Sequence, residues 1–347
     1  NLRAAWLSDH RKKALLAEVG VGTIDQALLG VLPRRHQALR LLGLADKVLV
    51  VDEVHAYDPY TTRLLQTLLE DHARQGGSAI LLSATIPQAL RRDLVSAWDR
   101  GRGGDSKALE GEDFPLATHV HDREVVEEGL APRPASRRKL PVQFLHDEED
   151  ALTAVLAAAD AGQWACWIRN TVDEAREAYQ ALHDRLDDPD RALLFHARFT
   201  MADRQRIEED ALAHFGKEST ATARAGRVLI ATQVVEQSLD LDFDVLVSDL
   251  APVELLIQRA GRLHRHARDA EGNPLPGENA ADQRPAPSLH VFAPEWGPEP
   301  GPDWARRVLP GTAAVYPNTV HLWRTAKVLR EEGGVQLPER ARPLLEG

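Results

Sequence analysis

Short apolar runs that alternate with amphipathic stretches are the feature that most restricts how this 347-residue chain can fold. Runs such as 47–51 and 79–82 are too short for helices and too continuously apolar for edge strands, which is typical of strands buried in a parallel sheet. The stretch between them, 61–71, places its four leucines on one helical face. This order predicts an α/β fold whose parallel sheets are covered by helices on both faces.

The same pattern recurs in the second half of the chain, so we expect two domains of similar size in tandem. Residues 1–100 would belong to the first domain and 142–270 to the second, with a polar linker at 101–141 and a loop-rich extension at 271–347. Further strands are expected at 164–168, 192–195, 228–231, 245–247 and 289–292, and helices at 25–42 (divided at Pro33), after Pro87, and at 171–186, 201–215 and 319–329.

Composition narrows the class of protein. The single cysteine, Cys166, excludes an intrachain disulfide and a thiolate metal site, and it favours a reducing, cytoplasmic compartment. No apolar stretch is long enough to span a membrane, so we expect no membrane partner. The net charge of −11 is unusual for a nucleic-acid binder, but phosphate binding needs only a local basic groove, and positive charge gathers at 34–36, 137–139 and 259–268.

Two adjacent carboxylates, Asp52 and Glu53, follow the first apolar run. Open α/β sheets bind their ligands at this end of a strand. In hydrolysis of a nucleoside triphosphate such as ATP, the first carboxylate holds Mg²⁺ through water, and the second orients or deprotonates the attacking water. His55 would then sense the nucleotide state. The structural alternative is a charged helix cap after a strand.

A second strand end carries Ser83 and Thr85, followed by Pro87. Small hydroxyl residues end many strands, so Ser-Ala-Thr alone has little weight. It gains weight here because it follows the carboxylate motif at the spacing of one βα unit. We predict that Ser83 and Thr85 couple the catalytic site to the rest of the molecule.

The second half contains a strand that runs into a polar turn at Thr232, and later Gln258 with three arginines at spacing three: Arg259, Arg262 and Arg265. Residues three apart share a helix face, so these guanidinium groups can converge. Permanently charged, bidentate donors suit a phosphate site, and an arginine supplied by a second domain can raise a rate by roughly 10³- to 10⁵-fold. A basic surface face is the structural alternative.

Taken in order, these motifs resemble those of superfamily-two helicases. The flanking sequences Val21-Gly-Thr-Ile-Asp-Gln26, Asp52-Glu-Val-His-Ala-Tyr-Asp58 and Gln258-Arg-Ala-Gly-Arg-Leu-His-Arg265 narrow the resemblance to the CRISPR-associated helicase-nucleases of type I interference systems. It covers nearly the whole chain. It implies two RecA-like domains, ATP and Mg²⁺ as cofactors, and as partners single-stranded DNA and a CRISPR RNA-guided surveillance complex with R-loop DNA.

The resemblance also implies roles for individual residues. Asp240 would lie near the ribose, Gln258 would belong to the catalytic set, and Arg262 and Arg265 would act as arginine fingers. The residues implied near the single strand are Gly22, Thr23, Asn170, Thr171, His196, Arg198 and Thr232.

One part of the helicase pattern is absent, since no Gly-x-x-x-x-Gly-Lys-Thr/Ser occurs in the chain. The first residue is Asn1 and the one methionine is Met201, so we expect a fragment whose phosphate loop and histidine-aspartate nuclease domain lie upstream, and which alone has negligible ATPase activity. Two alternatives stay open. The chain could belong to another superfamily-two motor, such as a restriction translocase or RNA helicase, or it could be a non-hydrolysing nucleic-acid-binding remnant.

Overall fold

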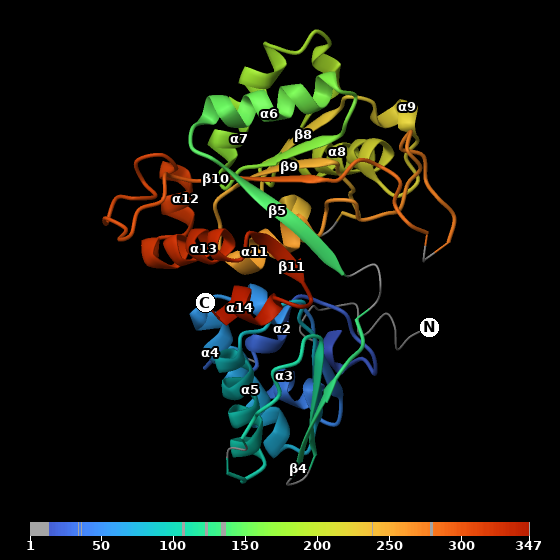
Figure 1. The fold of residues 1–347 in the computed structure, drawn as a ribbon. Coiled ribbons are helices and arrows are strands. Elements are labelled where there is room, and N and C mark those ends of the chain that lie inside the picture. The colour runs from blue at the N-terminus through green and yellow to red at the C-terminus, as the bar shows by residue number, and fades with distance from the viewer. Residues whose placement is uncertain are drawn as a thin grey trace, which may run out of the picture. The chain divides into compact units, whose positions relative to one another are not determined.

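The computed structural model describes residues 14–33, 35, 37–105, 108–121, 124–132, 137–237, 239–277 and 280–346. The chain divides into two compact units, one formed mainly by Asn1–Ala131 and the other mainly by Pro132–Leu345 (Figure 1). The expected α/β class is confirmed, and the two units are described separately below.

Unit 1 is built around two parallel strands and the long helices that follow them. Leucines of the first long helix, with Val51 and Val54, form its core. Asp58 begins that helix by accepting the N–H groups of Tyr60 and Thr61. In chain order the elements are η1 (Ala14–Leu16), α2 (Ile24–Leu28), α3 (Gln37–Leu44), β1 (Val48–Val51), η2 (Val54–Ala56), α4 (Pro59–Arg74), β2 (Ser78–Leu81), α5 (Gln88–Gly101), β3 (Leu116–His121) and β4 (Glu124–Gly129).

The small β1–β2 sheet differs from the expected strands buried on both faces. Val51 is buried, but Val48 and Val50 are 59% and 57% exposed, and Ile80 of β2 is also exposed. Among the described residues, the core of unit 1 packs on the opposite face, which carries Val51. The hydrophobic pattern predicted the two strands correctly, but it did not predict that one face of them is exposed.

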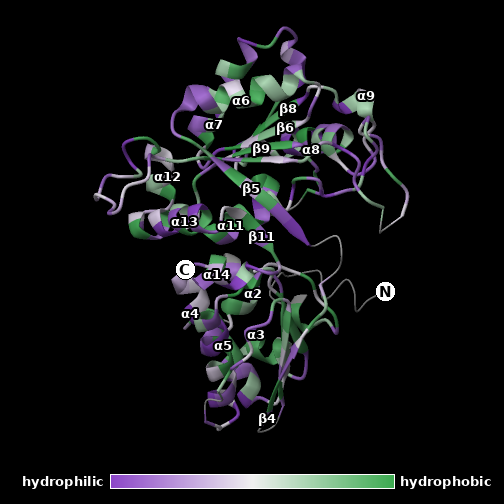
Figure 2. Ribbon diagram, in the orientation of Figure 1, coloured by the Kyte–Doolittle hydropathy of each residue, from purple (hydrophilic) through white to green (hydrophobic). Residues whose placement is uncertain are grey.

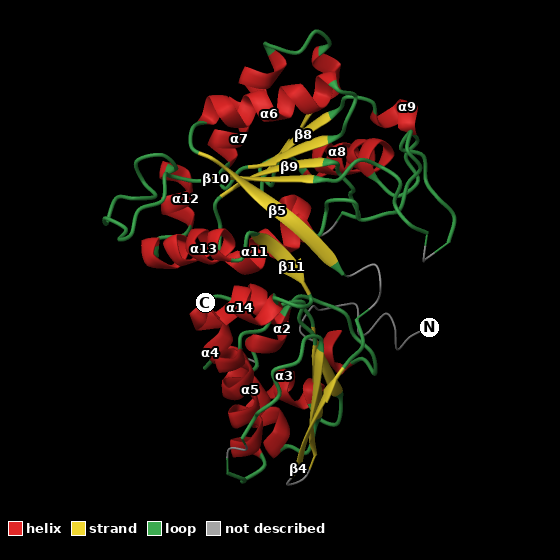
Figure 3. Cartoon of the chain, in the orientation of Figure 1, coloured by secondary structure: helices red, strands yellow, loops and turns green. Residues whose placement is uncertain are grey.

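Unit 2 is a seven-stranded sheet in the order β11-β5-β10-β9-β6-β8-β7, parallel throughout except where β11 pairs antiparallel with β5 (Figure 3). Figure 2 shows its central strands as hydrophobic, and β6, β8 and β9 are buried along their whole length. Trp164 and Trp167 are buried in this core.

The elements of unit 2 follow the expected alternation of strands and helices. They are β5 (Arg138–Leu145), α6 (Glu148–Asp160), β6 (Ala165–Ile168), α7 (Val172–His183), η4 (Pro189–Arg191), β7 (Ala192–Phe195), α8 (Met201–Phe215), α9 (Ala221–Arg224), β8 (Val228–Ala231), α10 (Val234–Gln237), β9 (Val245–Asp249), α11 (Val253–Ala260), β10 (Ser288–Phe292), α12 (Pro310–Val315), α13 (Thr319–Glu331), β11 (Gly334–Leu337) and α14 (Ala341–Glu346).

Two stretches carry more regular structure than their composition indicates. The expected linker, 101–141, holds the β3–β4 hairpin and the start of β5. The expected loop-rich extension, 271–347, supplies β10 and β11 to the sheet, and β10 lies between β5 and β9. Strands that are distant in sequence become neighbours through backbone pairing, which local composition does not encode.

Candidate functional site

The paired carboxylates of unit 1 lie at the carboxyl end of β1. Asp52 and Glu53 are both exposed, and an Asp52 carboxylate oxygen accepts the Glu53 N–H at 2.9 Å. Glu53 has φ 54° and ψ 43°, the left-handed region that non-glycine residues rarely adopt. Such a backbone costs on the order of 1–3 kcal/mol, and strain of this kind gathers at functional sites. Tyr57 donates its hydroxyl to the Asp52 carbonyl at 3.1 Å and braces the turn.

His55 joins this turn to the end of the neighbouring strand. Its Nδ1 lies 2.8 Å from the Ser83 hydroxyl, and its Nε2 lies 3.3 Å from a Glu53 carboxylate oxygen. Ser83 donates to the Thr85 carbonyl at 2.9 Å. The Thr85 hydroxyl is buried and has no hydrogen-bond partner among the described residues. The structure therefore brings Glu53, His55 and Ser83 into one chain of contacts across β1 and β2.

The carboxylates of this turn suit Mg²⁺. Magnesium prefers oxygen ligands and is held in nucleotide sites by one or two carboxylates together with phosphates and water. No group of three or more His, Cys, Asp or Glu side chains able to hold a metal occurs in the part of the chain that the structure describes. The exposed Asp52 carboxylate is of the chemical type that can hold Mg²⁺ together with a nucleotide.

The three arginines were expected to share one helix face, but α11 ends at Ala260, so only Arg259 lies on it and Arg262 and Arg265 follow it. Arg259 is fully buried, and its guanidinium donates to Glu236 at 2.7 Å, to the Ser248 hydroxyl at 2.8 Å and to the Asn170 side-chain oxygen at 3.0 Å. The spacing predicted that Arg259 converges with the other two arginines on a phosphate, but here its guanidinium is bonded to buried protein groups. Its signal was its place among Leu256, Ile257 and Ala260, since a charge on an apolar helix face must find buried partners.

Arg262 is also buried, and it donates to the backbone carbonyls of Glu236 (2.6 Å) and Leu239. Burial, with the nearby charge of Arg265, lowers its pKa. Gln258 lies half-buried on α11. In this conformation Arg262 therefore holds the turn after α10 in place.

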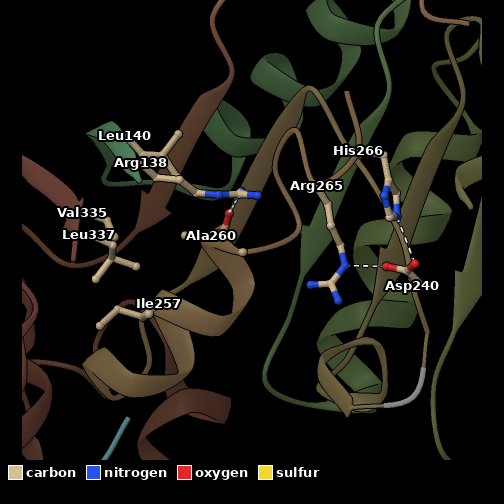
Figure 4. Close-up of a pocket in the computed structure, with 10 residues that line it drawn as sticks. Arg138, Leu140, Asp240, Ile257, Ala260, Arg265, His266, Val335 and Leu337 are labelled. Carbon is tan, nitrogen blue, oxygen red and sulfur yellow. Dashed lines mark hydrogen bonds and ion pairs between the residues drawn. The ribbon is translucent and has the colours of Figure 1, made fainter. Parts of the chain in front are cut away.

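Arg265 differs, because its side chain is 42% exposed and lines a cavity of about 450 Å³. Asp240 lies between Arg265, to which it is hydrogen-bonded, and His266, whose Nε2 is 3.0 Å from a carboxylate oxygen (Figure 4). Burial raises the pKa of Asp240, but the hydrogen bond from Arg265 and the charges of both neighbours bring it below its ordinary value. The apolar wall includes Ile257 and Val335.

The residues implied near a single strand fall into two groups in unit 2. Asn170 and Thr232 are buried. The Asn170 amide nitrogen donates to the Leu250 carbonyl (2.8 Å) and the Thr312 hydroxyl (2.7 Å), so both its hydrogens are used inside the protein.

In the second group Arg198 is exposed, Thr171 is half-buried and His196 is buried. Thr171 caps α7 through the Glu174 N–H, and the exposed Arg198 pairs with Asp173 at 2.9 Å. His196 stacks on Phe199 at 4.1 Å, and burial, with nearby arginines, lowers its pKa. All these residues follow carboxyl ends of parallel strands or begin the next helix.

In unit 1 the implied strand residues are Gly22 and Thr23. Both are exposed, and no atom lies within 4 Å of the position that a Cβ on Gly22 would occupy. Thr23 precedes α2 without donating or accepting a side-chain cap bond. Their backbone is therefore open to a ligand.

Comparisons with known proteins agree on one family. Residues 161–268 match the family described as CRISPR-associated nuclease/helicase Cas3, C-terminal. The CRISPR-associated endonuclease/helicase Cas3 of Escherichia coli (strain K12) is 37% identical over 348 residues, covering 96% of this chain and 36% of the relative. The chain spans about a third of the length of the curated relatives it matches.

Solved structures give the same result. The crystal structure of T. fusca Cas3-ADP is 36% identical with a TM-score of 0.84, covering 99% of this chain and 40% of that one. A chain of a CRISPR RNA-guided surveillance complex, pre-nicking, is 38% identical with a TM-score of 0.80, covering 97% and 41%. Within the described residues, no helix has the length and apolar character needed to cross a bilayer.

Proposed function

Because this chain belongs to the family of CRISPR-associated Cas3 nuclease/helicases, we propose that it forms part of an ATP-dependent motor that moves along single-stranded DNA. The observation that carries the proposal is the contact chain of Glu53, His55 and Ser83, which ties a strained carboxylate to a second strand end. A charged helix cap would need neither the strain nor the histidine link.

Asp52 is the residue proposed to hold Mg²⁺, through water, and the metal supplies charge stabilisation to the phosphates when bound. Glu53 is proposed to orient and deprotonate the attacking water. It would transmit its state through His55 to Ser83 and Thr85, and the Thr85 hydroxyl, which has no partner among the described residues, could form a new hydrogen bond.

Arg265 is the arginine proposed to neutralise the charge of the transferring phosphate, and it would exchange the Asp240 carboxylate for a phosphate oxygen. Arg262 would first have to release two backbone carbonyls, so we propose it as a less direct phosphate contact than Arg265. Gln258 completes the catalytic set, and Asp240, once released, is proposed to lie near the ribose.

The strand is proposed to lie along Gly22 and Thr23 and along the strand ends of unit 2 at Thr171 and Arg198. Asn170, His196 and Thr232 would act from beneath that surface, since all three are buried. Binding of this kind depends on backbone phosphates, so it should tolerate sequence and weaken with salt.

The biological setting is proposed from the relatives. A related chain is part of a CRISPR RNA-guided surveillance complex, so we propose such a complex, with its displaced DNA strand, as the partner. The motor would unwind target DNA for degradation by an associated nuclease domain in the cytoplasm. The buried free thiol of Cys166 fits a reducing compartment.

The decisive experiment measures ATP hydrolysis by the full-length gene product with and without single-stranded DNA. Glu53→Gln should lower kcat by about 10²- to 10⁴-fold while ATP binding persists, because the general base is lost and the shape is kept. Asp93→Asn, an exposed carboxylate on α5, is the matched control and should hydrolyse ATP normally. Normal turnover in Glu53→Gln refutes the assignment, and stimulation by RNA but not DNA favours an RNA helicase.

A further inference from the structure

Unit 2 carries a group of aromatic and basic side chains that the proposed motor does not use. Trp296 follows β10, and Trp323, Lys327 and Arg330 lie on α13; these four residues are named the tryptophan–cation cluster. The two indole rings stack with centroids 6.1 Å apart and planes 17° apart. Lys327 lies 5.7 Å from the centre of the Trp323 ring, and Arg330 lies 5.7 Å from that of Trp296.

The cluster is held in place by bonds to the backbone. Trp323 donates its ring N–H to the Gly297 carbonyl at 2.8 Å, and Trp304 donates to the Glu295 carbonyl at 2.8 Å. These two bonds fix the segment after β10. Trp296 nevertheless remains 39% exposed, so an indole is presented to solvent on a braced segment. A surface that is already ordered loses little entropy when a ligand binds.

The position of the cluster continues the proposed strand path. Six parallel strands, β7, β8, β6, β9, β10 and β5, end at one edge of the sheet, and Trp296 lies four residues beyond the end of β10. Helix α12, which precedes α13 in the chain, is bonded to the sheet edge, because Thr312 accepts from the Asn170 amide and the Gly311 N–H donates to Glu174 at 3.0 Å. Figure 1 shows α12 and α13 following each other along this side of unit 2.

The charge of the cluster favours a polyanion. The exposed side of α13 presents Arg324, Lys327 and Arg330, and Glu331 lies 3.8 Å from Lys327. Trp296 is flanked in sequence by the exposed Glu295 and Glu299, so the cations available to a phosphate are those of α13. Aromatic rings interleaved with cations are the arrangement that binds single-stranded nucleic acid without sequence preference, through stacking and phosphate contacts.

We infer that the tryptophan–cation cluster is a second contact site for the single strand, in which a base stacks on Trp296 while Lys327 and Arg330 neutralise adjacent phosphates. The inference rests on the proposed function, because it extends the same strand beyond the sheet edge. It adds an indole and two cations that none of the helicase motifs contains.

Binding of a fluorescein-labelled oligothymidylate to this chain, followed by fluorescence anisotropy over a salt series, tests the inference. Trp296→Leu should weaken binding roughly 5- to 100-fold, and Trp296→Phe should restore most of it, because a stacking ring returns. Lys327→Gln and Arg330→Gln should each lower the slope of log K against log salt by about 0.7. Arg206→Gln, an exposed arginine on α8, is the charge-matched control.

The outcomes separate this inference from the proposed function. Unchanged affinity in Trp296→Leu, with thermal unfolding like that of the parent chain, overturns the inference and points to a protein partner for the cluster. If Arg198→Gln weakens binding in the same series, the proposed strand path still stands. A parent chain that does not bind the oligonucleotide overturns both.

Discussion

The two units hold their motif residues in opposite ways. In unit 1, Asp52 and Glu53 are exposed on a strained turn braced by a few contacts. In unit 2, Arg259 and Asn170 are buried in a network in which each polar group meets several partners. The difference fits the proposal that unit 1 presents reacting groups, whereas Arg259 and Arg262 of unit 2 are bonded to other parts of the protein.

Arg265 is an exception, because it belongs to unit 2 but is exposed like the carboxylates of unit 1. Arg265→Gln should therefore lower kcat for ATP hydrolysis by roughly 10³- to 10⁵-fold in the full-length gene product. Its free energy of unfolding should change by less than about 0.5 kcal/mol, as for other surface substitutions. A variant that hydrolyses ATP at the parent rate would show that the phosphate contact lies elsewhere.

Arg259→Met gives the opposite expectation and is the strongest test of the buried network. Removing this guanidinium leaves the Glu236 carboxylate buried without its partner, so unit 2 should lose about 3–5 kcal/mol of stability. Chemical denaturation followed by circular dichroism measures the loss. Arg204→Met, which removes a half-exposed i,i+4 pair with Glu208, should cost about 0.5 kcal/mol or less. A similar loss of unfolding free energy in both variants would show that the buried network of unit 2 is no more important for stability than a surface ion pair.

Thr171→Ala tests whether a residue implied to touch the strand also supports the fold. Its hydroxyl caps α7 through the Glu174 N–H, so its loss should cost about 1 kcal/mol. Thr171→Ser keeps the cap and should keep the stability. If Thr171→Ser also retains affinity for a single strand while Thr171→Ala loses both, the cap and not the methyl group matters.

Acid pH should weaken unit 2 gradually, because burial lowers the pKa of His290 and His196. A histidine with a lowered pKa binds fewer protons in the folded than in the unfolded state, so stability is complete above the unfolded pKa of about 6.5 and falls as pH drops below it. His290→Leu should flatten the decline of unfolding temperature between pH 7 and about 5.5. The exposed His183→Gln should leave it unchanged.

Sequence patterns predicted strands and helices well where the hydrophobic pattern of a single element is clear. The runs at 192–195 and 228–231 match β7 and β8 residue for residue, and 201–215 matches α8. The contact between Glu53, His55 and Ser83 was also foreseeable, because carboxyl ends of adjacent parallel strands meet at one edge. The sequence did not show which motif residues are buried. Asn170 has the same local pattern as any polar residue after a strand, and its partner Thr312 lies 142 residues away.

The sequence by itself determined the α/β class, the family and the presence of two adjacent carboxylates after a strand. These depend on residue type and on the spacing of motifs along the chain. Only the tertiary structure decided that α11 ends at Ala260, that Arg259 is buried among protein partners and that Arg265, beyond the helix, is exposed. It also decided that Trp296 stacks on Trp323. The reason is physical: burial and partnership are set by strand order and by packing between distant segments, and a local pattern records neither.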